Sequence, residues 1–145
     1  MRFLMMIKAS KQSEANVMPG AAVLERMMKY NEELSKAGVL LDLAGLHPSS
    51  KGARIRFHGT QTTVIDGPFT EAKELIAGYW LIQVKSRQEA IEWARRVPFD
   101  GPTGAMAGED GELELRQLFD LTDFPEANAE TLATAAKIGS KLEHP

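Results

Sequence analysis

Hydrophobic positions along the chain follow two patterns, one typical of strands and one typical of helices. Residues 3–7 and 78–84 are apolar on both faces, which predicts strands that are covered from both sides. Residues 39–50 form an apolar extended segment that ends at a proline, and 53–66 reads as two short strands around a His-Gly turn. In 112–119, leucines alternate with charged residues, as expected for a half-exposed strand.

Two amphipathic segments predict helices. Apolar residues recur at helical spacing from 23 to 37, and Gly38 follows as a natural C-terminal cap. The second segment, 86–97, opens with Ser86 and Glu89 at the spacing of a capping box. The methionines in the first helix and in the first strand fit ordinary core positions.

A third helix is predicted at the C-terminus, from Asp123 to about Ile138, with Gly139 ending it. The residues that signal its start are Asp123, Pro125 and Glu126. We therefore expect one α+β domain over residues 1–119 and a helical extension over 120–145.

The order of elements predicts an α+β fold in which two helices cover one face of an antiparallel sheet of four or five strands. Helices on one face leave the other face of the sheet bare. Because the strands 3–7 and 78–84 are apolar on both faces, we expect a second copy of the chain to cover that bare face in a two-fold homodimer.

Composition excludes several classes of function. With 17 basic and 20 acidic residues the chain has a formal charge of -3, which argues against direct nucleic-acid binding. It has no cysteine, so it forms neither disulfides nor thiolate metal sites. No apolar run approaches a membrane span, and the N-terminal run is too short for a signal peptide, so we expect a cytoplasmic protein. Three scattered histidines and no nucleotide-binding motif predict neither a metal site nor a cofactor.

The tripeptide Asp-Gly-Pro occurs twice, starting at Asp66 and at Asp100, and on its own it is turn chemistry. We interpret the second copy as a turn. The first is followed by Phe69, Glu71, Lys73 and Glu74. Neighbouring carboxylates and a lysine shift one another's pKa values, so this cluster is a candidate for acid-base chemistry. In that chemistry Asp66 would be the base, Lys73 or Arg56 would stabilise negative charge, and Glu71 and Glu74 would orient them. A solvated turn with weak surface ion pairs is an equal alternative.

Histidine and arginine supply the other candidates. His47, at the end of an apolar segment, would form a proton-transferring dyad if a carboxylate such as Asp66 lay beside it, although a plain loop position is the more ordinary interpretation. His58 is expected to be solvated, and His144 lies in the tail. Arg56 and its neighbour on the polar face of the same strand either bind an anionic ligand or reach water.

The chain resembles the YCII-related family, specifically its Asp-Gly-Pro-Phe (DGPF) branch, over about residues 1–119. The resemblance rests on "MRFLMMIK", "EELSKAGVLLDLAGLHP", "VIDGPFTEAKELIAGYWLIQVKSRQEAIEWARRVP" and "ELELRQL". The residues that fit the central family pattern are Asp66, Gly67, Pro68, Phe69, Glu71, Lys73, Glu74, Gly78 and Tyr79. Arg56 and Arg116 also fall where the family tends to carry arginine.

This resemblance implies a ferredoxin-like dimeric α/β barrel with a pocket between sheet and helices in each subunit. The wider superfamily includes muconolactone-isomerase-like proteins and a dehydrochlorinase associated with a His-Asp pair. Here the first predicted helix carries no histidine, and His47 follows it in a loop. Many members of the branch accompany extracytoplasmic-function sigma factors.

Two functions are expected from these observations. The first is binding of a small anionic or hydroxylated organic ligand near Asp66, with lyase or isomerase chemistry by proton transfer. In this hypothesis His47 assists, and the ligand contacts are Arg56, Glu71, Glu74 and Tyr79. The alternative is a non-catalytic dimeric ligand-binding or regulatory module linked to a sigma factor.

Overall fold

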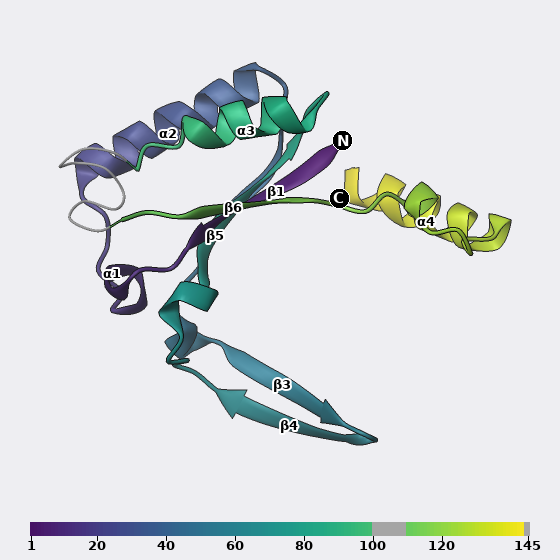
Figure 1. Ribbon diagram of the computed structural model, residues 1–145, viewed down its shortest axis with the longest axis horizontal. Coiled ribbons are helices and arrows are strands. Elements are labelled where there is room, and N and C mark those ends of the chain that lie inside the picture. Colours follow the sequence, from purple (N-terminus) through teal and green to yellow (C-terminus); the bar gives the residue numbers. More distant parts are fainter. Residues whose placement is uncertain (100–109, 144–145) are drawn as a thin grey trace.

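A computed structural model describes residues 1–99 and 110–143 of the chain. Four antiparallel strands form the main sheet in the order β2-β5-β1-β6 (Figure 1). Their bounds are Arg2–Lys8 for β1, Leu40–Gly45 for β2, Ile76–Gln83 for β5 and Leu113–Gln117 for β6. This order, with a long helix between β1 and β2 and another between β5 and β6, is an α+β arrangement consistent with a ferredoxin-like fold. The repeated Asp-Gly-Pro at Asp100 lies outside the described residues.

Helices α2 (Ala21–Lys36) and α3 (Arg87–Arg95) lie on the same face of the sheet (Figure 1). Both predictions of helix position are confirmed: Gly38 follows α2 with a φ of 71°, and the Ser86 side chain accepts a hydrogen bond from the Glu89 amide. The alternation of each strand sends every second side chain into the core between sheet and helices.

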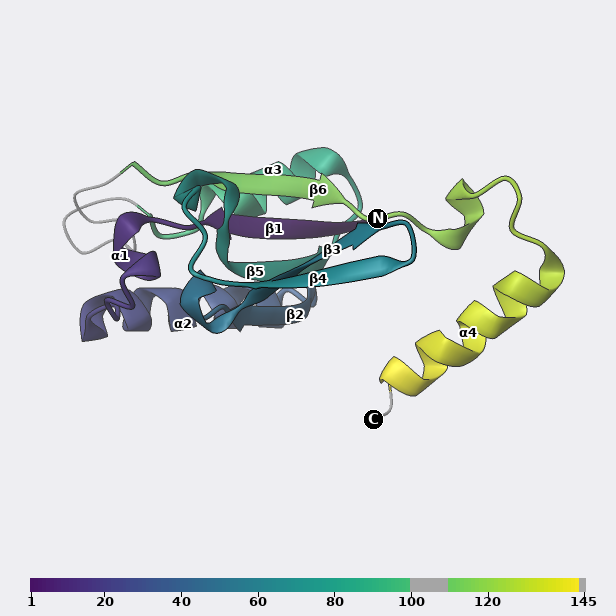
Figure 2. The ribbon, with the colours of Figure 1, turned by 90° about the horizontal axis from the view of Figure 1, so that it is seen from below.

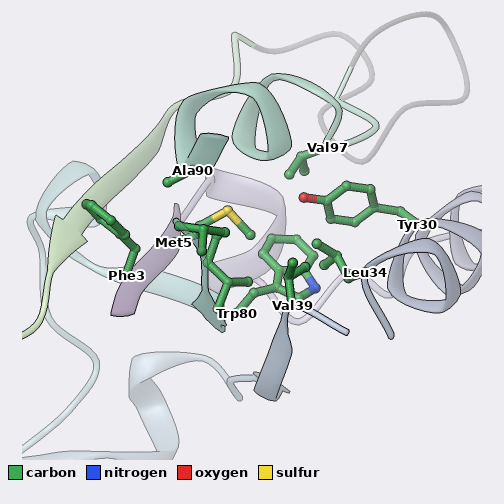
Figure 3. Packing of buried hydrophobic residues seen from close by; sticks show 10 residues of the cluster. Phe3, Met5, Tyr30, Leu34, Val39, Trp80, Ala90 and Val97 are labelled. Atoms are coloured by element: carbon green, nitrogen blue, oxygen red, sulfur yellow. The ribbon is translucent and has the colours of Figure 1, made fainter. Parts of the chain in front are cut away.

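The core is an apolar cluster between the sheet and the two helices (Figure 3). Met5, Leu34 and Ile82 are its largest fully buried side chains. At its centre the rings of Tyr30 and Trp80 meet edge to face, with centroids 5.5 Å apart. The Tyr30 hydroxyl donates to the Trp93 carbonyl oxygen over 2.8 Å, which joins α2 to α3. Met28, predicted to be core, is 65% exposed, because it lies on the outer side of α2.

Strands β3 (Ala53–His58) and β4 (Gln61–Asp66) form a separate two-stranded hairpin. Gly59, with a φ of 60°, makes the turn that the sequence predicted between them. Figures 1 and 2 show the hairpin projecting on the side of the sheet opposite α2 and α3. All six residues of β3 are exposed, including His58, as expected.

No helix covers the other face of the sheet within the described residues, 1–99 and 110–143. Leu4 and Met6 on β1 and Tyr79 and Leu81 on β5 lie on this face and are half-buried. Charged groups on the same face form the ion pairs Lys8–Glu114, Arg116–Glu114 and Arg2–Asp120, of 2.9, 3.1 and 2.8 Å, and the Asp42 carboxylate accepts a hydrogen bond from the Tyr79 hydroxyl. Its centre is therefore apolar and its charges are already compensated.

The C-terminal helix differs from its prediction. Helix α4 spans Ala129–Glu143, so it begins six residues after Asp123 and continues through Gly139. Asn128 caps it, since its side-chain oxygen accepts a hydrogen bond from the Thr131 amide over 2.9 Å. Asp123 instead closes the short 3-10 turn η3 (Leu121–Asp123). A single glycine costs a helix only about 1 kcal/mol relative to alanine, so Gly139 alone does not end it.

Figures 1 and 2 show α4 standing apart from the sheet and the other helices. Within the described residues, no helix is both long enough and apolar enough to cross a membrane. The short helix α1 (Lys11–Glu14), which the hydrophobic pattern did not predict, follows β1 directly.

Candidate functional site

A cavity of about 440 Å³ lies beside the start of α2 and the end of β1. Its apolar lining includes Ile7, Val17, Met18, Pro19, Val23, Met27, Leu46, Pro48, Ala77 and Phe99. Its polar lining consists of Lys8, Ser10, Gln12, Ser13, Asn16 and His47. Among the described residues that line the cavity, none is Asp or Glu. A volume of this size and a lining that is mostly apolar with a few hydrogen-bonding groups are typical of small-molecule sites.

Helix α1 builds the polar wall of the cavity. Ser10 and Ser13 form a reciprocal capping box, in which each hydroxyl accepts a hydrogen bond from the other residue's amide, over 2.8 and 3.1 Å. This box orients Gln12 and Ser13, two of the cavity-lining residues. Polar residues that looked like a loop in the sequence therefore form one wall of the cavity.

The loop after β2 forms another wall, through His47 and the buried Pro48. The next residue, Ser49, is tied to α1: the Glu14 carboxylate accepts hydrogen bonds from the Ser49 amide at 3.1 Å and from its hydroxyl at 2.5 Å. Because Glu14 ends α1 and Ser49 begins η1 (Ser49–Lys51), this carboxylate holds the two walls together.

The Asp-Gly-Pro-Phe turn, which we call the DGPF turn (66–69), packs against the same Ser49. The Phe69 amide donates to the Ser49 hydroxyl over 3.0 Å, and the Gly67 amide donates to the Gly52 carbonyl over 2.9 Å. A Cβ on Gly67 would lie 1.8 Å from the Ser49 carbonyl oxygen, so only glycine allows this approach. The turn thus braces the loop that carries His47.

The carboxylates predicted around the DGPF turn do not come together with a histidine. Asp66, Glu71 and Glu74 are all exposed, and none lines the cavity. No hydrogen bond or ion pair joins any two of them within the described part of the chain. Glu71 precedes the 3-10 turn η2 (Ala72–Glu74). The Lys73 side chain lies outside what the structure describes.

The two arginines of β3 have different surroundings. The guanidinium of Arg54 lies over the Phe69 ring, 3.9 Å from its centroid, so it packs on the DGPF turn. Arg56 is exposed on the projecting hairpin. Neither lines the cavity.

Tyr79 lies on the uncovered face of the sheet, since its neighbour Trp80 points into the core. Its hydroxyl donates a 2.9 Å hydrogen bond to the Asp42 carboxylate. That bond, helped by burial and by the negative charge of Asp42, raises the pKa of Tyr79 above its ordinary value. His47 is thus the residue of the predicted set, among those with described side chains, that lines the cavity.

Lys8 is the charged residue of the cavity lining, and its ammonium lies 2.9 Å from the Glu114 carboxylate. The hydrogen bond between them raises the pKa of Lys8, and together with Arg116 it lowers the pKa of Glu114. The pair is therefore fully charged at neutral pH. The ammonium keeps two further donors for another partner.

The family resemblance implied a pocket between sheet and helices, but the residues that line this cavity were not predicted from the sequence, except His47. Its lining comes from five separate stretches of the chain, and such a convergence is visible only once the strands are paired. One local signal was available: Ser10 and Ser13 at a spacing that suits a helix cap, in a stretch that has no apolar period.

The fold and cavity define a small α+β protein with a mostly apolar pocket next to an antiparallel sheet. The model of the YCII-related domain matches residues 1–111, so the chain belongs to the YCII-related family. It is 35% identical over 109 residues to an uncharacterized protein of Rhizobium meliloti (strain 1021). The aligned region covers 75% of this chain and 78% of that protein.

Proposed function

We propose that the protein binds a small, mainly apolar organic molecule that carries a hydroxyl or carboxylate group, in the cavity beside α1. The lining of this cavity supports the proposal: ten apolar residues and a set of neutral hydrogen-bonding residues form it, and among the described lining residues Lys8 is the charged one and none is Asp or Glu. A cationic ligand would find no anionic partner there.

Within this proposal the DGPF turn is a support and not the binding site. Its contacts are with Ser49, whose loop forms a cavity wall, and its exposed carboxylate, Asp66, does not line the cavity. Should the protein catalyse a proton transfer on its ligand, that role falls to His47 rather than to Asp66.

We also propose a homodimer in which the uncovered face of the sheet packs against its copy. Support comes from the half-buried apolar centre of this face and from its internally paired charges, which can be buried without leaving a charge unpartnered. The link to a sigma factor and the cytoplasmic location stay predictions of the resemblance and of the sequence.

Ligand binding is tested by thermal shift with three naphthalene probes: 2-naphthol, 2-naphthoate and the cationic 2-naphthylmethylammonium. A ligand at 100 times its dissociation constant stabilises the folded state by about 2.7 kcal/mol, which for a chain of this size raises the Tm by roughly 5–10 °C. We expect such a rise with naphthol and naphthoate and none with the cation.

The matched variants are Val23→Phe and Leu24→Phe, which place the same aromatic ring at neighbouring positions of α2. Val23 lines the cavity, whereas Leu24 is 49% exposed outside it. Val23→Phe should abolish the shift and Leu24→Phe should preserve it. An equal shift in both variants would show that the probes bind elsewhere.

A further inference from the structure

The β3–β4 hairpin carries an apolar face that is exposed among the residues that the structure describes. Ile55 pairs with Val64, and Phe57 points to the same side as Ile55. The exposed fraction is 51% for Ile55, 64% for Val64 and 79% for Phe57. An isolated two-stranded hairpin is at best marginally stable in water, so an apolar face of this kind needs a partner.

A second uncovered apolar surface lies on the segment 119–143, which we call the C-terminal arm. Phe119, Ile138 and Leu142 are 73%, 56% and 76% exposed. The root of the arm is fixed, because the Arg2 guanidinium donates to the Phe119 carbonyl at 3.3 Å and pairs with Asp120 at 2.8 Å. Beyond this root the arm first runs away from the body, and α4 then turns back toward it while standing apart from the sheet (Figure 2).

The segment that leads into and forms β3 and the first half of the C-terminal arm carry opposite charge. Residues 51–58 contain three cations, Lys51, Arg54 and Arg56, and no acid. Residues 120–130 contain four acids, Asp120, Asp123, Glu126 and Glu130, and no lysine or arginine. Figures 1 and 2 show hairpin and α4 as separate projections, and no hydrogen bond or ion pair joins the two segments within the described residues.

We propose that in the homodimer the C-terminal arm of each chain packs on the β3–β4 hairpin of the other. The inference rests on the homodimer proposed above and adds an element outside its sheet interface. A second copy is the fitting occupant because one chain carries both halves of the contact, apolar to apolar and acidic to basic. Two-fold symmetry then forms the contact twice and leaves neither surface open.

The absence of cysteine from the chain permits a direct cross-linking test. Single-cysteine variants are made on the hairpin, Phe57→Cys, and on the arm, at Leu132, Ile138 and Leu142 in turn. All four positions are exposed, so the fold should tolerate the change. On mixing under mild oxidation, we expect a disulfide-linked pair of differently tagged chains for at least one arm position.

In the matched control, the cysteine on the arm is replaced by one on α2, in the variant Lys36→Cys. Lys36 is exposed and lies away from both projections. The arm contact would be overturned if no arm variant gives a higher yield of cross-linked dimer with Phe57→Cys than Lys36→Cys does.

A charge exchange gives an independent measurement by sedimentation equilibrium at low salt. Lys51→Glu with Arg56→Glu, and separately Glu126→Lys with Glu130→Lys, should each weaken dimerisation at least fivefold. Combining all four changes in one chain should restore the dissociation constant to within about twofold of wild type. Weakening without restoration would contradict the contact.

The two proposals fail differently. A wild-type chain that stays monomeric at every concentration refutes the homodimer, and the arm contact with it. A dimer that forms no arm-to-hairpin cross-link above the control, and whose affinity ignores the charge changes, keeps the homodimer and overturns the arm contact.

Discussion

The close approach of Gly67 to the loop after β2 makes Gly67→Ala the sharpest test of how the DGPF turn works. The new Cβ would stand 1.8 Å from the Ser49 carbonyl oxygen and 2.6 Å from its carbon. Real Cβ contacts almost never fall below 3.0 Å, so the two backbones must separate by about 1.2 Å. A backbone oxygen, unlike the end of a side chain, cannot rotate away.

The separation breaks bonds as well as packing. Overpacking costs about 1–3 kcal/mol, and each lost neutral hydrogen bond about 1 kcal/mol. The bonds at risk are Phe69 amide to Ser49 hydroxyl and Gly67 amide to Gly52 carbonyl. We therefore expect Gly67→Ala to lower the free energy of unfolding by about 3 kcal/mol.

Urea denaturation at fixed protein concentration measures this loss, with two glycine controls. A Cβ on Gly52 would lie 3.4 Å from the same Ser49 oxygen, and a Cβ on Gly45 would meet nothing within 4 Å. Both alanine variants should stay within about 1 kcal/mol of wild type. If Gly67→Ala is as stable as these controls, the turn does not brace the loop and the reasoning is wrong.

Three further outcomes follow from the core and from the ion pair at the cavity. Tyr30→Phe removes the bond to the Trp93 carbonyl, which still accepts from the Arg96 amide, so urea denaturation should show a loss of about 1 kcal/mol. Burial raises the pKa of Tyr30, and the hydrogen bond to Asp42 raises the pKa of Tyr79. Ultraviolet titration should therefore show both phenols ionising above the usual pH of about 10. The free energy of unfolding should fall as pH rises past about 10. The hydrogen bond from Lys8 lowers the pKa of Glu114, so the stability that Glu114 provides is present above about pH 4.3 and is lost as pH falls further. Glu114→Gln should therefore flatten the fall of Tm between about pH 5 and 3. An unchanged slope of Tm against pH would contradict the pairing.

Local patterns predicted the sheet and its two covering helices well. Apolar runs identified β1 and β5, and the capping residues Gly38 and Ser86 placed α2 and α3. Each of these signals lies within the element it describes or directly beside it. The same kind of signal failed for α4, because Asp123 closes a 3-10 turn and the helix starts at Ala129, capped by Asn128.

The candidate site was predicted less well, for a physical reason. The sequence predicted that its near neighbours Asp66, Glu71 and Glu74 converge. In the structure all three side chains are exposed to solvent. The cavity draws on residues as far apart as Ile7 and Phe99, which meet only through the fold. His47 was identified because it ends an apolar segment, a property that does not depend on its distant neighbours.

The central claim is that ligand binds in the cavity beside α1 while the DGPF turn only supports it. Isothermal titration of 2-naphthol into wild type, Asp66→Asn and Val23→Phe tests this claim most directly. Asp66 is exposed outside the cavity and Val23 lines it. The claim predicts an affinity within twofold of wild type for Asp66→Asn and a loss of at least tenfold for Val23→Phe. Loss of binding in Asp66→Asn with full binding in Val23→Phe would contradict it.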